Sequence, residues 1–112
     1  MNIKTRQETT ASVFEVLDDR IDSSIAVDFK DYVCRAIDSG QYDVVLDLSR
    51  VDFVDSSGIG AIVGVFKHLG TRGTFSVAGL TRSVARVFQL TRMDKVFQVY
   101  PSVEEALAGR SP

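Results

Sequence analysis

The sequence predicts an α/β domain in which helices pack on a central mixed sheet. Short apolar runs of strand length alternate along the chain with longer segments whose apolar residues recur at helical spacing. Such alternation implies parallel neighbouring strands joined by helices. The chain has 112 residues, of which 45% are hydrophobic and 25% charged, as is typical of a globular domain. Because no proline-rich or low-complexity linker divides it, we expect residues 1–112 to form a single domain.

Two strands, residues 2–8 and 11–17, open the predicted order of elements. The first alternates in polarity like a polar edge strand, and the second is rich in β-branched and aromatic residues. Residues 24–38 then change to helical spacing. Serine is a preferred residue at helix starts, so Ser23 or Ser24 is the expected N-cap of this helix.

The rest of the chain repeats the order of strand and helix. Residues 43–48 form a nearly continuous apolar run, which is typical of a strand covered on both faces. The helices and strands expected after it are residues 57–69, 74–78, 81–91, 95–99 and 102–107. Ser102 and Glu105 match the S-x-x-E pattern of a capping box at the start of the last helix. We therefore expect about five strands and about four helices.

Composition excludes several classes of function. The chain carries 13 basic and 15 acidic residues, so it lacks the basic excess of a protein that binds nucleic acid directly. It contains no apolar run long enough to cross a membrane, and the polar segment Met1–Thr10 lacks the apolar core of a signal peptide, which predicts a cytoplasmic protein. With Cys34 as its one cysteine and His68 as its one histidine, the chain predicts neither a disulfide nor a metal site, and we expect no cofactor.

The most informative segment is Val51–Gly60, which reads VDFVDSSGIG between a buried strand and an amphipathic helix. Ser56 or Ser57 falls where the helix N-cap belongs, and capping alone accounts for the pattern. A helix N-terminus also tolerates a phosphate, whereas the neighbouring Asp55 carboxylate would repel one. This conflict suits a reversible phosphorylation switch, and both interpretations stay open at this point.

Enzymatic patterns do not fit this segment. Residues 58–60 begin like a dinucleotide-binding loop, but Val63 stands where a third small residue is required. His68 lies about three turns from Ser56 along the same helix, too far to accept its proton. A receiver domain has an acidic, metal-binding pocket, but it also has a further strand and helix between the aspartates of that pocket, which this sequence lacks. We therefore expect no enzymatic activity.

Residues 43–69, DVVLDLSRVDFVDSSGIGAIVGVFKHL, resemble the central segment of STAS domains, specifically those of bacterial anti-sigma factor antagonists. The family pattern is a strand ending in Asp-Leu, a short loop, and D-S-[ST]-G-[LIV]-G at the start of a helix. Asp47–Leu48 and Asp55–Gly60 match it. Later segments resemble the family as well, so the likeness spans most of the chain and implies one STAS domain with a mixed sheet.

The resemblance implies partner switching. In this family the unphosphorylated protein binds an anti-sigma factor, which is also a GHKL-type serine kinase, and thereby frees the sigma factor. The kinase phosphorylates the serine that follows the Asp, and this serine maps to Ser56. Phosphorylation abolishes binding, and a PP2C-type phosphatase removes the phosphate. Asp55, Ser57, Gly58 and Ile59 map to the partner-binding surround of that serine.

A second acidic position, Asp22, is also implied by the resemblance as a partner contact. The family loop usually contains G-x-[LIV]-D, whereas this chain reads Asp19-Arg20-Ile21-Asp22, without the glycine. The alternative function is a non-switching STAS scaffold subunit of a signalling or lipid-transport complex. A serine directly after Asp55 favours the switch.

Overall fold

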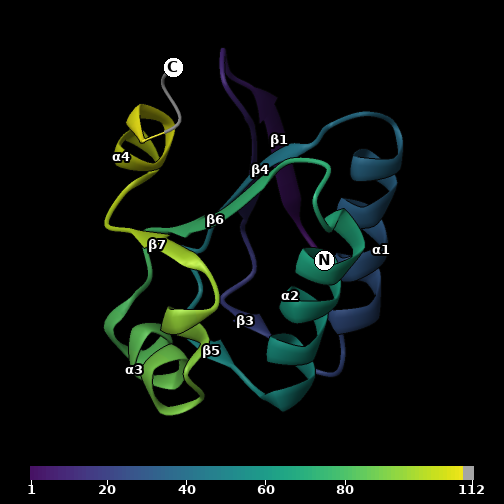
Figure 1. Ribbon diagram of the computed structural model, residues 1–112. Helices are drawn as coiled ribbons and strands as arrows, with labels where there is room; N and C mark the ends of the chain where they lie inside the picture. Colours follow the sequence, from purple (N-terminus) through teal and green to yellow (C-terminus); the bar gives the residue numbers. More distant parts are fainter. Residues whose placement is uncertain (110–112) are drawn as a thin grey trace.

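The computed structural model describes residues 1–109 and contains a five-stranded mixed sheet (Figure 1). In spatial order the sheet consists of β1 (Ile3–Gln7), β2 (Ser12–Val16), β4 (Asp43–Asp47), β6 (Thr74–Ala78) and β7 (Gln98–Tyr100). β1 runs antiparallel to β2, and the other neighbouring pairs are parallel. The predicted mixed α/β sheet is therefore confirmed. Residues 110–112 of the predicted domain lie outside the described part of the chain.

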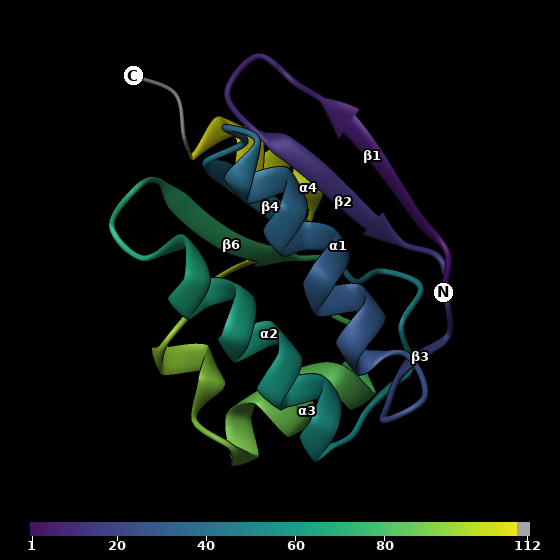
Figure 2. The same cartoon turned by 90° about the vertical axis from the view of Figure 1, so that its right-hand side faces the viewer.

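Helices cover both faces of this sheet. α1 (Ala26–Asp38) and α2 (Ser56–Leu69) lie side by side on one face, as Figure 2 shows. α3 (Arg82–Leu90) packs into the same core, whereas α4 (Val103–Ala108) covers the opposite face. Within residues 1–109, none of the helices has the length and apolar character needed to cross a bilayer.

The hydrophobic core is divided by the sheet into two parts. The larger part, under α1, α2 and α3, includes the fully or almost fully buried side chains Phe14, Phe29, Leu46, Ile62 and Phe88. The smaller part, under α4, includes Val13, Val45, Ala78 and Ala106. Along β4, Val44 and Leu46 face the larger part and Val45 faces the smaller one. The continuous apolar run therefore does mark a strand covered on both faces.

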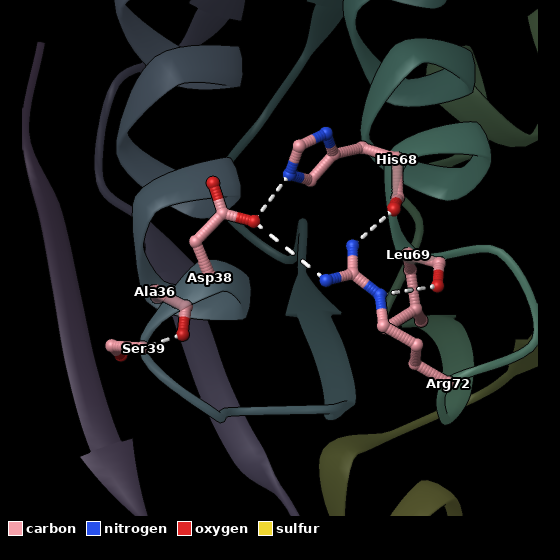
Figure 3. A network of polar contacts seen from close by, with 6 residues as sticks. All are labelled: Ala36, Asp38, Ser39, His68, Leu69 and Arg72. Atoms are coloured by element: carbon pink, nitrogen blue, oxygen red, sulfur yellow. Dashed lines mark hydrogen bonds and ion pairs between the residues drawn. The ribbon is translucent and has the colours of Figure 1, made fainter.

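A polar network joins α1 to α2 at their C-terminal ends (Figure 3). Asp38 Oδ1 lies 2.8 Å from His68 Nε2 and 3.7 Å from Arg72 Nη1. The Arg72 guanidinium also donates to the carbonyl oxygens of His68 and Leu69. Because these side chains are exposed, the network contributes little to stability, about 0–1 kcal/mol for each pair. It lies at the opposite end of α2 from Ser56.

Two short strands and one helical turn differ from the prediction. β3 (Arg20–Ile21) and β5 (Phe53–Val54) pair in parallel as a second, two-stranded sheet in segments that we expected to be loops. Two residues are too few to show an alternating pattern. A 3₁₀ turn at Met93–Lys95 also moves the last strand to Gln98–Tyr100 from the expected 95–99.

The start of α1 also differs from the prediction. The helix begins at Ala26, and its N-cap is Ile25 rather than Ser23 or Ser24. The backbone N–H groups of Ile25 and Ala26 donate to the carbonyl oxygen of Asp22 at 3.1 and 2.9 Å. The first turn is thus closed by backbone bonds. The last helix begins one residue later than predicted, and the serine half of the expected capping box is present, because Ser102 Oγ accepts from the N–H of Glu105 at 3.1 Å.

Candidate functional site

The candidate site lies where the N-terminal end of α2 meets the small sheet of β3 and β5 (Figure 1). Ile21 pairs with Val54, and the backbone N–H of Asp55 donates to the carbonyl oxygen of Ile21 at 3.3 Å. Asp22 and Asp55 directly follow these two strands. The pairing therefore brings both predicted acidic residues to the end of the molecule where Ser56 begins α2.

Asp55, and not a serine, caps α2. Its backbone is extended, and its Oδ1 accepts a hydrogen bond from the N–H of Gly58 at 2.9 Å. This corrects the expectation that Ser56 or Ser57 is the N-cap. A carboxylate at this position satisfies a free N–H group and also complements the positive end of the helix dipole.

Ser56 occupies the first position of α2 and is exposed. Because Asp55 makes the capping bond, the Ser56 hydroxyl has no hydrogen-bonding partner among residues 1–109. Free N–H groups and a partial positive charge at this end of a helix favour an anion. A phosphate can therefore be attached here without breaking an internal contact. Ser57 is exposed as well.

The other residues predicted to bind a partner differ in exposure. Gly58 is buried, and a β-carbon on it would lie 2.2 Å from the carbonyl oxygen of Ile21. Ile59 is half-buried and packs against the larger core. Gly58 therefore sets the distance between α2 and β3 and contributes no exposed surface to a contact.

Asp22 is a half-buried carboxylate fixed by its neighbours. Its Oδ1 accepts from the hydroxyl of Ser24 at 2.6 Å and from the N–H of Ser24 at 3.0 Å. These two bonds lower the pKa of Asp22, and the guanidinium of Arg20, 3.6 Å from Oδ2, lowers the pKa further. The structure therefore presents Asp22 as a charged and oriented group beside β3.

Arg20 and Phe53 form an exposed pair that the sequence analysis missed. They are register partners on β3 and β5, and the Arg20 guanidinium carbon lies 5.3 Å from the centroid of the Phe53 ring. Phe53 is 47% exposed, whereas the next residue, Val54, is buried. Because β5 has only two residues, no periodic pattern in the sequence marked Phe53 as exposed. Exposed aromatic and arginine side chains are the types that most often anchor protein interfaces.

Acidic groups surround the site. Asp19 and Asp52 are exposed and are joined through their backbones, since the N–H of Asp52 donates to the carbonyl oxygen of Asp19 at 2.7 Å. With Asp22 and Asp55, which follow the other ends of β3 and β5, they form an acidic rim around the small sheet. Within the described part of the chain, no group of three or more metal-ligating side chains is close enough to hold a metal ion.

The chain belongs to the STAS domain family, whose model matches residues 2–106. BtrV of Bordetella bronchiseptica, provisionally named as an anti-sigma factor antagonist, is 30% identical over 90 residues, which cover 80% of this chain and 78% of that protein. A Thermotoga maritima protein with the same provisional name is 31% identical over 72 residues, which cover 63% of this chain and 64% of the relative. The alignment thus spans slightly less than two thirds of the Thermotoga protein.

Solved structures show the same fold. An anti-sigma factor antagonist from Mycobacterium paratuberculosis is 26% identical, with a TM-score of 0.89 over 97% of this chain and 92% of that one. The phosphorylated form of the Bacillus protein SpoIIAA is 20% identical, with a TM-score of 0.72 over 96% of this chain and 97% of that one. The resemblance to STAS domains of the anti-sigma factor antagonist type is therefore confirmed.

Proposed function

We propose that this protein is an anti-sigma factor antagonist that acts as a phosphorylation-controlled partner switch. Its unphosphorylated form binds an anti-sigma factor that is also a GHKL-type serine kinase, and the sigma factor is released. Phosphorylation of Ser56 abolishes the binding, and a PP2C-type phosphatase restores it. The observation that carries the proposal is the exposed Ser56 hydroxyl, which Asp55 frees from any capping role.

The charges at the site explain how a phosphate would act as a switch. A phosphoserine adds about −1.5 to −2 charges. On Ser56 these charges would join the acidic rim while remaining compatible with the N-terminal end of α2. The helix is thus preserved, but a partner that packs against the neutral hydroxyl would have to desolvate a dianion. A newly buried, unpaired charge weakens binding by about 2–5 kcal/mol.

The proposed contact surface is formed by the site's exposed and half-exposed groups. Phe53 and Arg20 offer an aromatic and cationic anchor beside Ser56. Asp22, held by Ser24, offers an oriented hydrogen-bond acceptor to the partner. The kinase supplies ATP and Mg²⁺, so this chain acts as a substrate and a binding partner and needs no catalytic residue of its own. Sigma factors act on RNA polymerase, which places the switch in the cytoplasm.

The test is to locate the phosphate. Trypsin cleaves after Arg50 and Lys67, so residues 51–67 are released as one peptide that contains both Ser56 and Ser57. The protein is incubated with its cognate GHKL-type kinase and ATP, and the peptide is fragmented between the two serines. We expect the phosphate on Ser56, loss of phosphorylation in Ser56→Ala, and retention in Ser57→Ala. Phosphate on Ser57 would overturn the assignment to Ser56, and phosphate on neither serine would favour the scaffold function.

A further inference from the structure

The three glycines of α2 have different surroundings. A β-carbon on Gly58 would collide with the backbone of Ile21 at 2.2 Å, and one on Gly64 would meet the side chain of Lys30 at 2.9 Å. A β-carbon on Gly60 would meet nothing within 4 Å. Gly60 is also exposed, and its φ lies outside the positive region that favours glycine.

The fold therefore gives no internal reason for a glycine at position 60. Glycine inside a helix is less stable than alanine, because the unfolded chain loses more conformational freedom when it folds. Neither the backbone conformation nor the packing of Gly60 within residues 1–109 offsets that loss.

The position of Gly60 relative to Ser56 suggests a reason. Gly60 comes four positions after Ser56, so the two residues lie one turn apart on the same face of α2. Side chains on a helix lean toward its N-terminus and cover the preceding turn. A side chain at position 60 would therefore lie over the Ser56 hydroxyl.

We infer that Gly60 is an access residue: its missing side chain leaves the Ser56 hydroxyl open to the catalytic groups of the kinase and the phosphatase. This inference rests on the proposed function. Phosphoryl transfer requires the reacting atoms to approach within about 3–3.5 Å, which leaves no room for a covering side chain.

The first test measures access without any kinase. In a Cys34→Ser background, Ser56→Cys places a thiol at the site, and its rate of reaction with a maleimide reports the access. Adding Gly60→Gln should slow this reaction by about threefold or more, because the common helical rotamers point over residue 56. The control Lys67→Gln places the same side chain at an exposed position near the other end of α2 and should leave the rate unchanged. An unchanged rate in Gly60→Gln would overturn the inference.

The second test measures phosphorylation of Ser56 by the cognate kinase. Gly60→Gln should lower the rate by about tenfold or more, since a small misplacement at the reacting atoms already costs that much. The melting temperature of Gly60→Gln itself should equal or exceed that of the parent, because glutamine is the better helix former, and this excludes unfolding as the cause. Equal phosphorylation of the parent and Gly60→Gln overturns the inference. If the parent is not phosphorylated on Ser56 but Gly60→Gln slows the thiol reaction as expected, the proposed function is overturned. The effect of Gly60 on access to position 56 would then still hold.

Discussion

The carbonyl oxygen of Ile21 lies 2.2 Å from the position that a β-carbon on Gly58 would occupy, and Val54 Cγ1 lies 2.7 Å from the same point. Real β-carbons essentially never make contacts shorter than 3.0 Å. α2 therefore packs directly on the backbone of β3 at a glycine. This close contact holds Asp22 next to the start of α2, where Asp55 and Ser56 lie.

Gly58→Ala should destabilise the protein, although alanine is the better helix former. The overlap forces β3 and α2 apart, and overpacking of this kind costs about 1–3 kcal/mol. For a domain of this size each kcal/mol lowers the melting temperature by about 4–8 °C. Calorimetric melting checks this, with Gly60→Ala as the matched control because its β-carbon meets nothing within 4 Å. Equal melting temperatures for the parent and Gly58→Ala would contradict the contact.

Substitutions at Asp55 separate its capping bond from its charge. Asp55→Ala removes the acceptor of the Gly58 N–H and should cost about 1 kcal/mol. Asp55→Asn keeps the bond and should cost less, because asparagine caps about as well as aspartate and only the dipole contribution of about 0.3–1 kcal/mol is lost. Chemical denaturation measures both values. Ser56→Ala serves as the control and should stay within about 0.5 kcal/mol of the parent. A larger loss in Ser56→Ala than in Asp55→Ala would mean that the serine is the cap.

Ser24→Ala should raise the pKa of Asp22 toward the ordinary aspartate value of about 3.9. The largest cause of the lowered pKa is the Ser24 hydroxyl bond, which this variant removes. Since the folded-state pKa is lowered, Asp22 contributes its stabilisation above the unfolded-state pKa and loses it as the pH falls through the folded-state value. The variant should therefore lose less stability in acid. NMR titration of the Asp22 carboxyl carbon checks the shift, with Ser23→Ala as control. An identical titration curve in Ser24→Ala would refute this account of Asp22.

Phosphorylation should leave the fold intact. α2 is held by the buried side chains of Ile62, Val65 and Leu69, and a dianion at its N-terminal end is electrostatically compatible with the helix dipole. We expect the melting temperature of the phosphorylated protein to lie within a few degrees of that of the parent. Circular dichroism on both forms measures this, and global unfolding of the phosphorylated form would rule out a local switch.

Strong local patterns made most of the fold predictable from the sequence. The uninterrupted run of Val44, Val45 and Leu46 marks a strand with two apolar faces, and β4 has both faces covered. The two strands that support the site were not predictable. Arg20 and Phe53 sit in strands of two residues, where no period exists, and their pairing depends on tertiary contacts.

The detail of the site was only partly predictable, for a related reason. Asp and Ser rank almost equally as N-caps, so spacing could not decide among the three residues from Asp55 to Ser57. Likewise, the sequence alone does not distinguish the surroundings of Gly58 from those of Gly60. Only the fold shows that one faces the backbone of β3 and the other faces open space.

The central claim is that charge on Ser56 decides whether the partner binds. Calorimetric titration of the cognate anti-sigma factor kinase with Ser56→Ala and Ser56→Asp tests it directly. Asp38→Ala, at the C-terminal end of α1 and far from Ser56, is the control for effects of stability alone. Ser56→Ala should bind within about fivefold of the parent, because only an unbonded hydroxyl is lost. Ser56→Asp should bind at least about 30-fold more weakly, since its charge must be desolvated without a partner. Equal affinities for the two variants would contradict the switch and leave Ser56 as an ordinary residue of a scaffold.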